Sequence, residues 1–434
     1  MDVRDAAYLS LVRCEKEGKY SNLEVDSSIK RYGFTGYDRA FYTALVYGVI
    51  EKQIFLDYVI SRFSSVPPEK IEPALLPILR LGVYQILCLD RVPDSAACNE
   101  CVELAKLHSH RGASGFVNGV LRAVARGKEK LPLPEKGSLS YYSVKYSCPP
   151  WLCKLWADQY GEERAEGLLQ GINRNPRITL RTNTLKTDRE GLLERLRAEG
   201  LACEPTSYSP VGVLLDEFTP VSSLTPLTEG LCFVQDESSQ LCSLAVGARP
   251  GEFVVDTCSC PGGKSFGMAM AMENRGKILC LDLHASKLSL VEKGADRLGI
   301  GILSTAVQNG TQRREELLSK ADRVLCDVPC SGLGVIAKKP DLRRKSPEEL
   351  SRLPEIQYRI LDTAASYVKP GGVLLYSTCT LNKEENEAVA DRFLREHPAF
   401  APDAENMPFG EARATLFPDE HGTDGFFMAK FRRG

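Results

Sequence analysis

The spacing of apolar residues changes along the chain and predicts regions of different architecture. In residues 1–128 apolar side chains recur every three or four positions, as in "DRAFYTALVYGVIEKQIFLDYVISRF", with Pro and Gly between the runs. This period is typical of amphipathic helices. We therefore expect an all-α helical domain of about five to seven helices in this part of the chain.

The next two segments depart from the helical period. Residues 129–146 contain two Pro and a Gly, and we expect a linker there. Residues 147–235 mix helical runs with short alternating segments such as "RITLRTNTLK", which are typical of strands. This segment is predicted to be a small α+β subdomain, of a kind that can offer a sheet face to RNA.

In residues 236–434 near-continuous apolar strands alternate with helical runs. The strands are predicted in "EFVVDTC", "GKILCLDL", "RVLCDVPC" and "GGVLLYSTCT". This order is typical of a parallel sheet covered by helices on both faces, as in Rossmann-like α/β domains. Ligands of such sheets bind at the carboxyl ends of the strands, where the unusual residues of this region lie.

Composition excludes several classes of protein. The chain has 434 residues, of which 43% are hydrophobic and 26% charged, as in ordinary globular proteins. We expect no membrane span and no signal peptide, because no apolar run is long enough. The 15 cysteines lie mostly in apolar runs and are expected to be thiols in a reducing cytoplasm. Cys98 and Cys101 form a CxxC without a second pair at zinc-ligand spacing, so core packing is expected there and no metal site.

Basic residues gather locally although the formal net charge is −2. Three segments stand out, at 106–130, 173–186 and 338–345. Each one alone is typical of a solvated surface. Together they favour a polyanionic partner such as RNA, whose phosphates they would contact.

The segment "VVDTCSCPGGKS", residues 254–265, ends like a phosphate-binding loop. Such a loop needs a Gly where the chain has Cys258, and Pro261 lacks an amide hydrogen for a phosphate. An ATPase remains an alternative, because "RVLCD" places an acid after a later strand. The Gly pair and Asp282, at the end of the next strand, are typical instead of a site for a nucleoside-bearing ligand.

Two cysteines follow the ends of strands in the same predicted sheet. Cys330 lies in "CDVPCSGLG" and Cys379 in "YSTCTLNKEENE". Because the carboxyl ends of parallel strands meet at one edge, we expect both thiols to converge on one cleft beside the loop.

These motifs resemble those of the RNA cytosine-5 methyltransferases of the RsmB/NOP family. The resemblance includes "FVQDESSQL" and "HGTDGFFMAKF", and the helical region with "FVNGVLR" resembles a NusB-type RNA-binding domain. It covers nearly the whole chain. It implies a Rossmann-like class I methyltransferase that transfers a methyl group from S-adenosyl-L-methionine to carbon 5 of a cytidine in 16S rRNA, naked or in an early precursor. A monomeric cytoplasmic enzyme without metal or membrane partner is expected. The same chemistry on tRNA and a non-catalytic RNA-binding assembly factor remain alternatives.

The resemblance also implies roles for individual residues. Carbon 5 of cytosine is a weak nucleophile until a thiolate adds to carbon 6, and this splits one hard step into easier ones. By resemblance Cys379 is that nucleophile, Cys330 assists release of the methylated base, and Asp327 contacts the cytosine ring. The donor would lie along residues 258–264, with Asp282 on its ribose. The full expected cofactor set is Cys258, Ser259, Cys260, Pro261, Gly262, Gly263, Lys264, Asp282, Asn309 and Asp327. Asn309 stands where family members usually carry an acid, and its amide can still contact an adenine edge.

Overall fold

The computed structural model describes residues 1–110, 112–216 and 224–434. Residue 111, within the basic segment 106–130, and residues 217–223, within the expected α+β subdomain, lie outside the described residues. The described chain forms two compact units. The helical unit comprises residues 1–173 and 338–345, and the sheet unit comprises residues 174–337 and 346–434.

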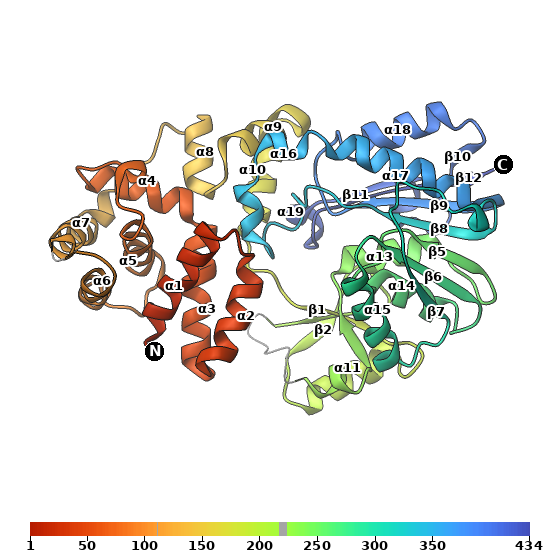
Figure 1. The fold of residues 1–434 in the computed structure, drawn as a ribbon, viewed down its shortest axis with the longest axis horizontal. Coiled ribbons are helices and arrows are strands. Elements are labelled where there is room, and N and C mark those ends of the chain that lie inside the picture. The colour runs from red at the N-terminus through yellow and green to blue at the C-terminus, as the bar shows by residue number, and fades with distance from the viewer. Residues whose placement is uncertain (111, 217–223) are drawn as a thin grey trace. The chain divides into compact units, whose positions relative to one another are not determined.

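The first part of the helical unit is all-α, as the apolar period predicts. Its helices pack around one core of apolar side chains (Figure 1). In this core Cys98 and Cys101 are buried, as expected for packing residues. The helices are α1 (Val3–Lys16), α2 (Ser21–Tyr32), α3 (Gly36–Glu51), α4 (Gln53–Phe63), α5 (Leu76–Cys88), α6 (Asp94–His108) and α7 (Ala113–Gly127), with short 3-10 turns at Pro68–Lys70 and Lys128–Lys130. Within the described residues, no helix of the chain is both long and apolar enough to span a bilayer.

The expected linker at 129–146 is not irregular throughout. Helix α8 (Leu139–Tyr146) begins there because the Ser138 side chain caps it, accepting a hydrogen bond from the amide of Tyr141. It is followed by α9 (Pro150–Tyr160) and α10 (Glu162–Gly171), which belong to the helical unit. The helical part of the predicted α+β subdomain therefore packs with the N-terminal helices.

The basic segment 338–345 also belongs to the helical unit, and the expected role is corrected for one of its cations, Arg343. It forms a 3-10 turn (Pro340–Arg344) in which the Arg343 side chain is buried. The guanidinium donates hydrogen bonds to the carbonyl oxygens of Tyr146 and Ser147, both at 2.8 Å, and of Ile172 at 3.0 Å. Arg343 is thus an internal anchor and is not available to an RNA phosphate.

The segment 173–186 likewise loses one of its expected phosphate contacts. Arg181 is 2% exposed and donates to the carbonyl oxygen of Gly267 at 3.4 Å. Burial lowers the pKa of Arg181 to about 10. Arg177, four residues before it, pairs with Glu204 at 2.7 Å, so this cation has an acidic partner.

The sheet unit begins with a small antiparallel sheet of order β2-β3-β1-β4. Leucines of α11 cover it and form a separate apolar cluster with its strands. The elements are β1 (Thr179–Thr182), α11 (Arg189–Ala198), β2 (Cys203–Pro205), β3 (Gly212–Leu215), α12 (Thr225–Thr228) and β4 (Cys232–Val234). The strand predicted in "RITLRTNTLK" is therefore present as β1.

The large sheet has eight strands in the order β10-β12-β9-β8-β5-β6-β7, with β11 paired to β12. Strands β5 to β9 are parallel, as predicted, but β10, β11 and β12 pair antiparallel. The sheet is therefore mixed, and the prediction missed its antiparallel edge. Its strands are β5 (Phe253–Asp256), β6 (Lys277–Asp282), β7 (Leu303–Val307), β8 (Ala321–Asp327), β9 (Val368–Thr378), β10 (Phe400–Pro402), β11 (Arg413–Leu416) and β12 (Phe426–Arg433).

Helices cover both faces of this sheet, and successive strand residues serve opposite faces. Val254 packs with the cluster formed by α13 (Glu237–Val246), α14 (Gly263–Ala271) and α15 (Ala285–Leu298). Val255 packs with the cluster formed by α17 (Leu353–Tyr367) and α18 (Glu387–Glu396). The described residues of the unit also form shorter elements, namely 3-10 turns at Glu315–Leu317 and Pro408–Gly410, α16 (Pro347–Leu350) and α19 (Pro418–His421).

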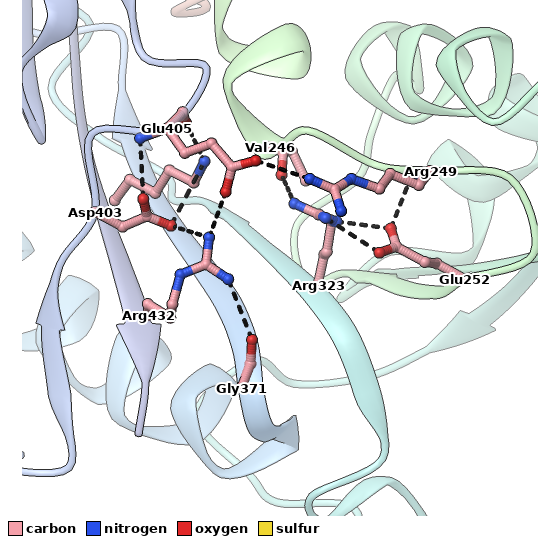
Figure 2. Close-up of polar contacts among 9 residues, drawn as sticks. Val246, Arg249, Glu252, Arg323, Gly371, Asp403, Glu405 and Arg432 are labelled. Carbon is pink, nitrogen blue, oxygen red and sulfur yellow. Dashed lines mark hydrogen bonds and ion pairs between the residues drawn. The ribbon is translucent and has the colours of Figure 1, made fainter.

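An ion-pair network lies at the amino ends of the parallel strands (Figure 2). Arg323, near the start of β8, pairs with Glu252 at 2.6 Å and donates to the Val246 carbonyl oxygen at 2.7 Å. Arg432, at the end of antiparallel β12, pairs with Asp403 and Glu405, both at 2.7 Å. These charged groups pair with one another at the amino ends of the parallel strands. The carboxyl ends of the same strands carry the candidate site.

Candidate functional site

The carboxyl ends of four parallel strands carry Asp256 and three residues that the sequence singled out, namely Asp282, Asp327 and Cys379. Asp256 ends β5, Asp282 ends β6, Asp327 ends β8 and Cys379 follows β9. Strand β5 lies between β6 and β8, and β8 lies beside β9, so these ends are neighbours at one edge. The expected convergence of these residues is therefore found in the fold.

The two predicted thiols lie close together. The sulfur atoms of Cys330 and Cys379 are 3.3 Å apart although 49 residues separate them. The hydrogen bond with Cys379 and burial hold the pKa of the Cys330 thiol well above its usual range. Cys330 therefore keeps its proton at neutral pH and can donate it toward the neighbouring sulfur.

Asp327 has a defined partner for each carboxylate oxygen. The Lys264 ammonium group donates to one oxygen at 2.7 Å, and the Ser377 hydroxyl donates to the other at 2.7 Å. Burial alone would lower the pKa of Lys264, but the charge of Asp327 outweighs it and raises this pKa above its usual value. The Lys264 ammonium also lies 5.2 Å from the centre of the Phe426 ring. A permanent cation is thus held beside the carboxylate, and Ser377 was not found by sequence reasoning.

A buried carboxylate that the sequence did not single out holds the two cysteine loops. Glu385 is fully buried and accepts hydrogen bonds from the Ser331 amide at 2.9 Å and the Ser331 hydroxyl at 2.5 Å. It also accepts from Asn382 at 3.0 Å and Gln357 at 2.8 Å. Ser331 follows Cys330, and Asn382 lies three residues after Cys379. Glu385 is one of three acids in "NKEENE", and the sequence alone does not tell which of them is buried.

Two glycines bring the same loops into backbone contact. The Gly334 amide donates to the Cys379 carbonyl oxygen at 3.0 Å, and the Gly425 amide donates to the Gly334 carbonyl oxygen at 2.8 Å. A Cβ at Gly334 would lie 2.0 Å from the Gly425 oxygen, so a larger residue would push the two segments apart. The segment "HGTDG" before β12 is thereby fixed beside the catalytic candidates.

The loop between β5 and α14 contributes residues of different kinds. Ser259 is buried and bonds the Leu281 carbonyl oxygen through its amide at 2.8 Å, so it fixes the loop to β6. Burial holds the pKa of the Cys258 thiol well above its usual range. Gly262 has a φ of 107° at the start of α14, and this left-handed conformation suits a glycine. Pro261 is exposed, with Gly263 and Lys264 following it in the first turn of α14.

Cys260 connects this loop to the end of β6. Burial and the adjacent Asp282 carboxylate raise the pKa of the Cys260 thiol to about 12. Asp282 itself is partly exposed, and one of its oxygens accepts a hydrogen bond from the His284 amide at 2.9 Å. The loop at residues 258–264 and Asp282, which the sequence analysis assigned to one ligand site, are therefore close in space.

Asp256 lies beneath the loop and is a further group that the sequence did not assign. It is 1% exposed and accepts a hydrogen bond from the Ser265 hydroxyl at 2.6 Å. Burial raises the pKa of Asp256 to about 7, and the nearby charge of Asp327 adds to this effect. The side chain is therefore partly protonated at neutral pH.

The surroundings of Asp282 fit an adenosine-bearing ligand. A carboxylate offers two acceptors for ribose hydroxyls. Two apolar side chains next to this strand end stay open to solvent, Leu283 at 57% and Val307 at 55% exposed, and they can pack against a purine ring. Asn309 follows β7 and its side-chain oxygen accepts from the Thr311 amide at 3.1 Å, which leaves its NH2 group to donate. The amides that open α14 suit the carboxylate of an amino acid.

The large sheet has eight strands and is mostly parallel. It carries an acid at the end of β6 that suits a ribose and a glycine loop before α14, and together these features define a Rossmann-like methyltransferase. Comparison with known proteins gives the family. The 16S rRNA methyltransferase RsmB/F family matches residues 243–432, the NusB family matches residues 1–126, and an RsmF/B-like ferredoxin-like domain matches residues 148–222. The chain belongs to the RsmB/F family.

Full-length relatives support this assignment. The chain is 39% identical to the probable ribosomal RNA small subunit methyltransferase B of Bacillus subtilis, covering 99% of this chain and 98% of that protein. It is 35% identical to the protein of the same name from Synechocystis, covering all of both chains. The crystal structure of PH0851 aligns with a TM-score of 0.84 at 28% identity, over 100% of this chain and 99% of that one.

A further solved structure shares the fold alone. The structure of NSun6 from Pyrococcus horikoshii with SFG aligns with a TM-score of 0.59 at 21% identity, over 66% of this chain and 98% of that one.

Members of the RsmB/F family use S-adenosyl-L-methionine as methyl donor, and this is the cofactor of the chain.

Proposed function

We propose that this enzyme methylates carbon 5 of one cytidine in 16S rRNA and that it forms a covalent bond between Cys379 and the base on the way. The observation that carries the proposal is the 3.3 Å distance between the sulfur atoms of Cys330 and Cys379, at the carboxyl ends of strands β8 and β9 of the methyltransferase sheet. A methyltransferase that acts on a nucleophilic oxygen or nitrogen needs no thiol. Carbon 5 of a pyrimidine does need one, because it becomes nucleophilic only after addition to carbon 6.

Cys379 supplies the nucleophile. Its thiolate adds to carbon 6, and the electrons of the ring double bond move to carbon 5. When bound, S-adenosyl-L-methionine supplies the electrophilic methyl group that this carbon takes up. A solvent water then takes the proton from carbon 5, the electron pair of that bond restores the double bond between carbons 5 and 6, and the bond between sulfur and carbon 6 breaks so that Cys379 leaves as a thiolate.

Cys330 and Asp327 assist these steps. The raised pKa of Cys330 supports a thiol that holds a proton at its sulfur near the reacting carbons, and we assign it to release of the base. Asp327, held by Lys264 and Ser377, presents its carboxylate to the polar edge of the cytosine. Lys264 orients this carboxylate, since the two groups form a close ion pair.

The donor is assigned to the first loop of the large sheet. Gly262, Gly263 and the opening of α14 would hold the amino-acid end, Asp282 the ribose hydroxyls and Asn309 the adenine edge. Cys258, Ser259, Cys260 and Pro261 shape the loop, and Ser259 does so through its bonds to the Leu281 carbonyl oxygen. Asp327 lies between the donor and base positions and serves both.

The division of labour along the chain follows from these assignments. We propose an RNA-binding domain over 1–128, a connecting segment over 129–146, an RNA-binding subdomain over 147–235 and a catalytic domain over 236–434. All 15 cysteines are free thiols, which supports action in the reducing cytoplasm. We propose a monomer that acts on naked or early precursor rRNA.

One assay tests the proposal. Unmodified 16S rRNA is incubated with methyl-labelled S-adenosylmethionine and the full-length protein, and the nucleosides are then separated. Label in 5-methylcytidine at one position is expected. Label in tRNA alone would keep the chemistry and replace the substrate. Label in a nucleoside other than 5-methylcytidine would overturn the assignment of carbon 5, and absence of label despite donor binding would favour a non-catalytic assembly factor.

A further inference from the structure

Three aromatic rings from separate segments of the sheet unit meet at its surface. Tyr208 comes from the loop between β2 and β3, Phe409 from a turn before β11, and His421 from the end of α19. The ring centres lie 5.9 Å apart for Tyr208 and Phe409, 5.7 Å for Tyr208 and His421, and 5.3 Å for Phe409 and His421. We name this cluster the aromatic platform.

Two of the three rings of the platform are open to solvent. Phe409 is 55% exposed and Tyr208 40% exposed, whereas aromatic rings of this unit such as Tyr376 and Phe427 are buried in the large sheet. Exposed aromatic rings lose the stabilisation that burial would give them. A cluster of them held in place is therefore typical of a binding surface.

Phe409 is also held in an unfavourable backbone conformation. Its φ is 65°, in the left-handed region, which a bulky aromatic residue rarely adopts. Such strain persists only where the surrounding structure maintains it, and it clusters at functional positions. Here the strain orients the Phe409 ring against its two partners and leaves most of its surface free.

Hydrogen bonds fix the platform to the candidate active site. The Tyr208 amide donates to Glu237 at 2.5 Å, and the adjacent residue Asp236 accepts from the Asp424 amide at 3.1 Å. Asp424 precedes Gly425, whose amide donates to Gly334, and Gly334 in turn donates to the Cys379 carbonyl oxygen. The platform and the Cys379 loop are thus parts of one bonded framework.

The chain itself limits the distance between platform and site. His421 lies five residues before Phe426, the ring beneath the Lys264 ammonium. At most about 3.6 Å per residue, these two residues are within roughly 18 Å of each other. This range suits the nucleotides next to a base that is bound at Cys379.

Cations flank the platform. Arg189 donates to the carbonyl oxygen of Ser209, next to Tyr208, at 3.4 Å. Arg174 donates to the carbonyl oxygen of Pro418, at the start of α19, at 3.5 Å. Guanidinium groups beside exposed rings form the combination that binds single-stranded nucleic acid, in which the rings stack on bases and the cations contact phosphates.

We propose that the aromatic platform binds unpaired RNA bases that flank the target cytidine, with Phe409 as its main stacking surface. This inference rests on the proposed function, because it takes the RNA held at Cys379 as the occupant. It adds a specificity-determining surface outside the reacting centre. A target base has to leave its stack to reach the cysteines, and stacking of its neighbours on protein rings offsets part of that cost.

The backbone of Phe409 permits a test that separates ring loss from misfolding. Asn and Gly tolerate a φ of about 65° better than Phe, so Phe409→Asn and Phe409→Gly should fold at least as stably as the unaltered protein. Both remove the ring. Tyr208→Ala removes a second ring, and Leu290→Ala on α15, which is 53% exposed, is the matched control for loss of an exposed apolar side chain.

The measurement is binding of a short fluorescein-labelled single-stranded RNA with one cytidine, by anisotropy at two salt concentrations, with thermal unfolding in parallel. Phe409→Asn, Phe409→Gly and Tyr208→Ala should weaken binding roughly 5- to 150-fold with an unchanged salt slope. Leu290→Ala should bind normally, and Phe409→Tyr should restore binding. Normal binding by folded Phe409→Gly, or no RNA binding by the unaltered protein, would overturn the platform.

The assay for 5-methylcytidine is run on the same proteins. Methyl transfer by the unaltered protein with an unchanged KM for RNA in Phe409→Gly would overturn the platform and leave the proposed function standing. Binding that depends on Phe409 without any methyl transfer would overturn the proposed function and keep the platform.

Discussion

Ser331 donates both its amide and its hydroxyl hydrogen to the carboxylate of Glu385, at 2.9 and 2.5 Å. Through this relationship a residue of the β9–α18 loop fixes the position of Cys330, the neighbour of Ser331 in the β8 loop. The separation of the two sulfur atoms therefore depends on Glu385, which bonds to residues of both cysteine loops. Glu385 is a positioning residue.

Glu385→Ala should leave several buried donors without an acceptor. We expect a loss of about 2–4 kcal/mol in the free energy of unfolding. A displacement of about 1 Å in the thiols can cost on the order of 100-fold in rate, so kcat should fall more than KM for RNA changes. Urea unfolding and single-turnover methylation measure both effects.

Glu384→Gln is the matched control for this prediction, because Glu384 is exposed and adjacent. Glu385→Gln should give an intermediate rate, since an amide keeps one acceptor oxygen and adds donors where only donors point. Equal rates in Glu385→Ala and Glu384→Gln would contradict a positioning role.

Removal of the Cys330 thiol should trap the covalent intermediate. In Cys330→Ser the addition to carbon 6 proceeds, but release of the base is slowed, so protein and RNA should migrate together on a denaturing gel. Cys379→Ala and the variant with both changes should form no such species. A covalent species in Cys379→Ala would reverse the roles of the two cysteines.

Asp256 should make stability depend on pH in a defined direction. Burial raises the pKa of Asp256 from its usual 3.8 to about 7. Between these values the native state binds more protons than the unfolded chain, so the free energy of unfolding falls as pH rises through this window. The contribution is at most about 4 kcal/mol, at 1.36 kcal/mol per pKa unit.

Asp256→Asn removes this titration. The difference in unfolding free energy between the variant and the unaltered protein should therefore grow in favour of the variant from about pH 4 to pH 7 and be constant above that. Urea denaturation across the range measures it. A difference that does not change with pH would show that Asp256 titrates normally in the folded protein.

Arg343→Met should destabilise the helical unit without changing RNA electrostatics. The carbonyl oxygens of Tyr146, Ser147 and Ile172 would lose their donor inside the unit, at a cost of about 3 kcal/mol. The salt dependence of RNA binding should not change, because the guanidinium is buried. Lys339→Gln, at an exposed neighbouring residue, is the control. A weaker dependence of RNA affinity on salt concentration in Arg343→Met would show that Arg343 contacts RNA.

Much of the fold follows from patterns that act over short distances. The helical period of residues 1–128 and the strands that end in Asp256, Asp282 and Asp327 are visible because each buried face repeats within its own element. The pairing of Cys330 and Cys379 also follows, since carboxyl ends of parallel strands share an edge. The antiparallel strand β12 was missed, because "FFMAKFRR" carries no signal for the strands that it pairs with.

The remaining features depend on contacts between distant segments. Arg181 and Arg343 look like surface cations in sequence, but each is buried by partners elsewhere in the chain. Glu385 is distinguished from Glu384 and Glu387 only by the donors around it. The helix at Leu139–Tyr146 lies after two prolines, which favour an irregular segment. The helix forms nevertheless, because the Ser138 side chain caps its first turn.

The anchoring of Arg343 in the helical unit has a consequence for how the protein is made. Residue 345, the last of the segment 338–345, is synthesised 172 residues after residue 173. At roughly 5–20 residues per second, the helical unit waits on the order of 10–35 s for its last peptide. During that interval the carbonyl oxygens that Arg343 later satisfies depend on water. The N-terminal part of the chain is therefore completed only when β5 to β8, half of the strands of the large sheet, have already been synthesised.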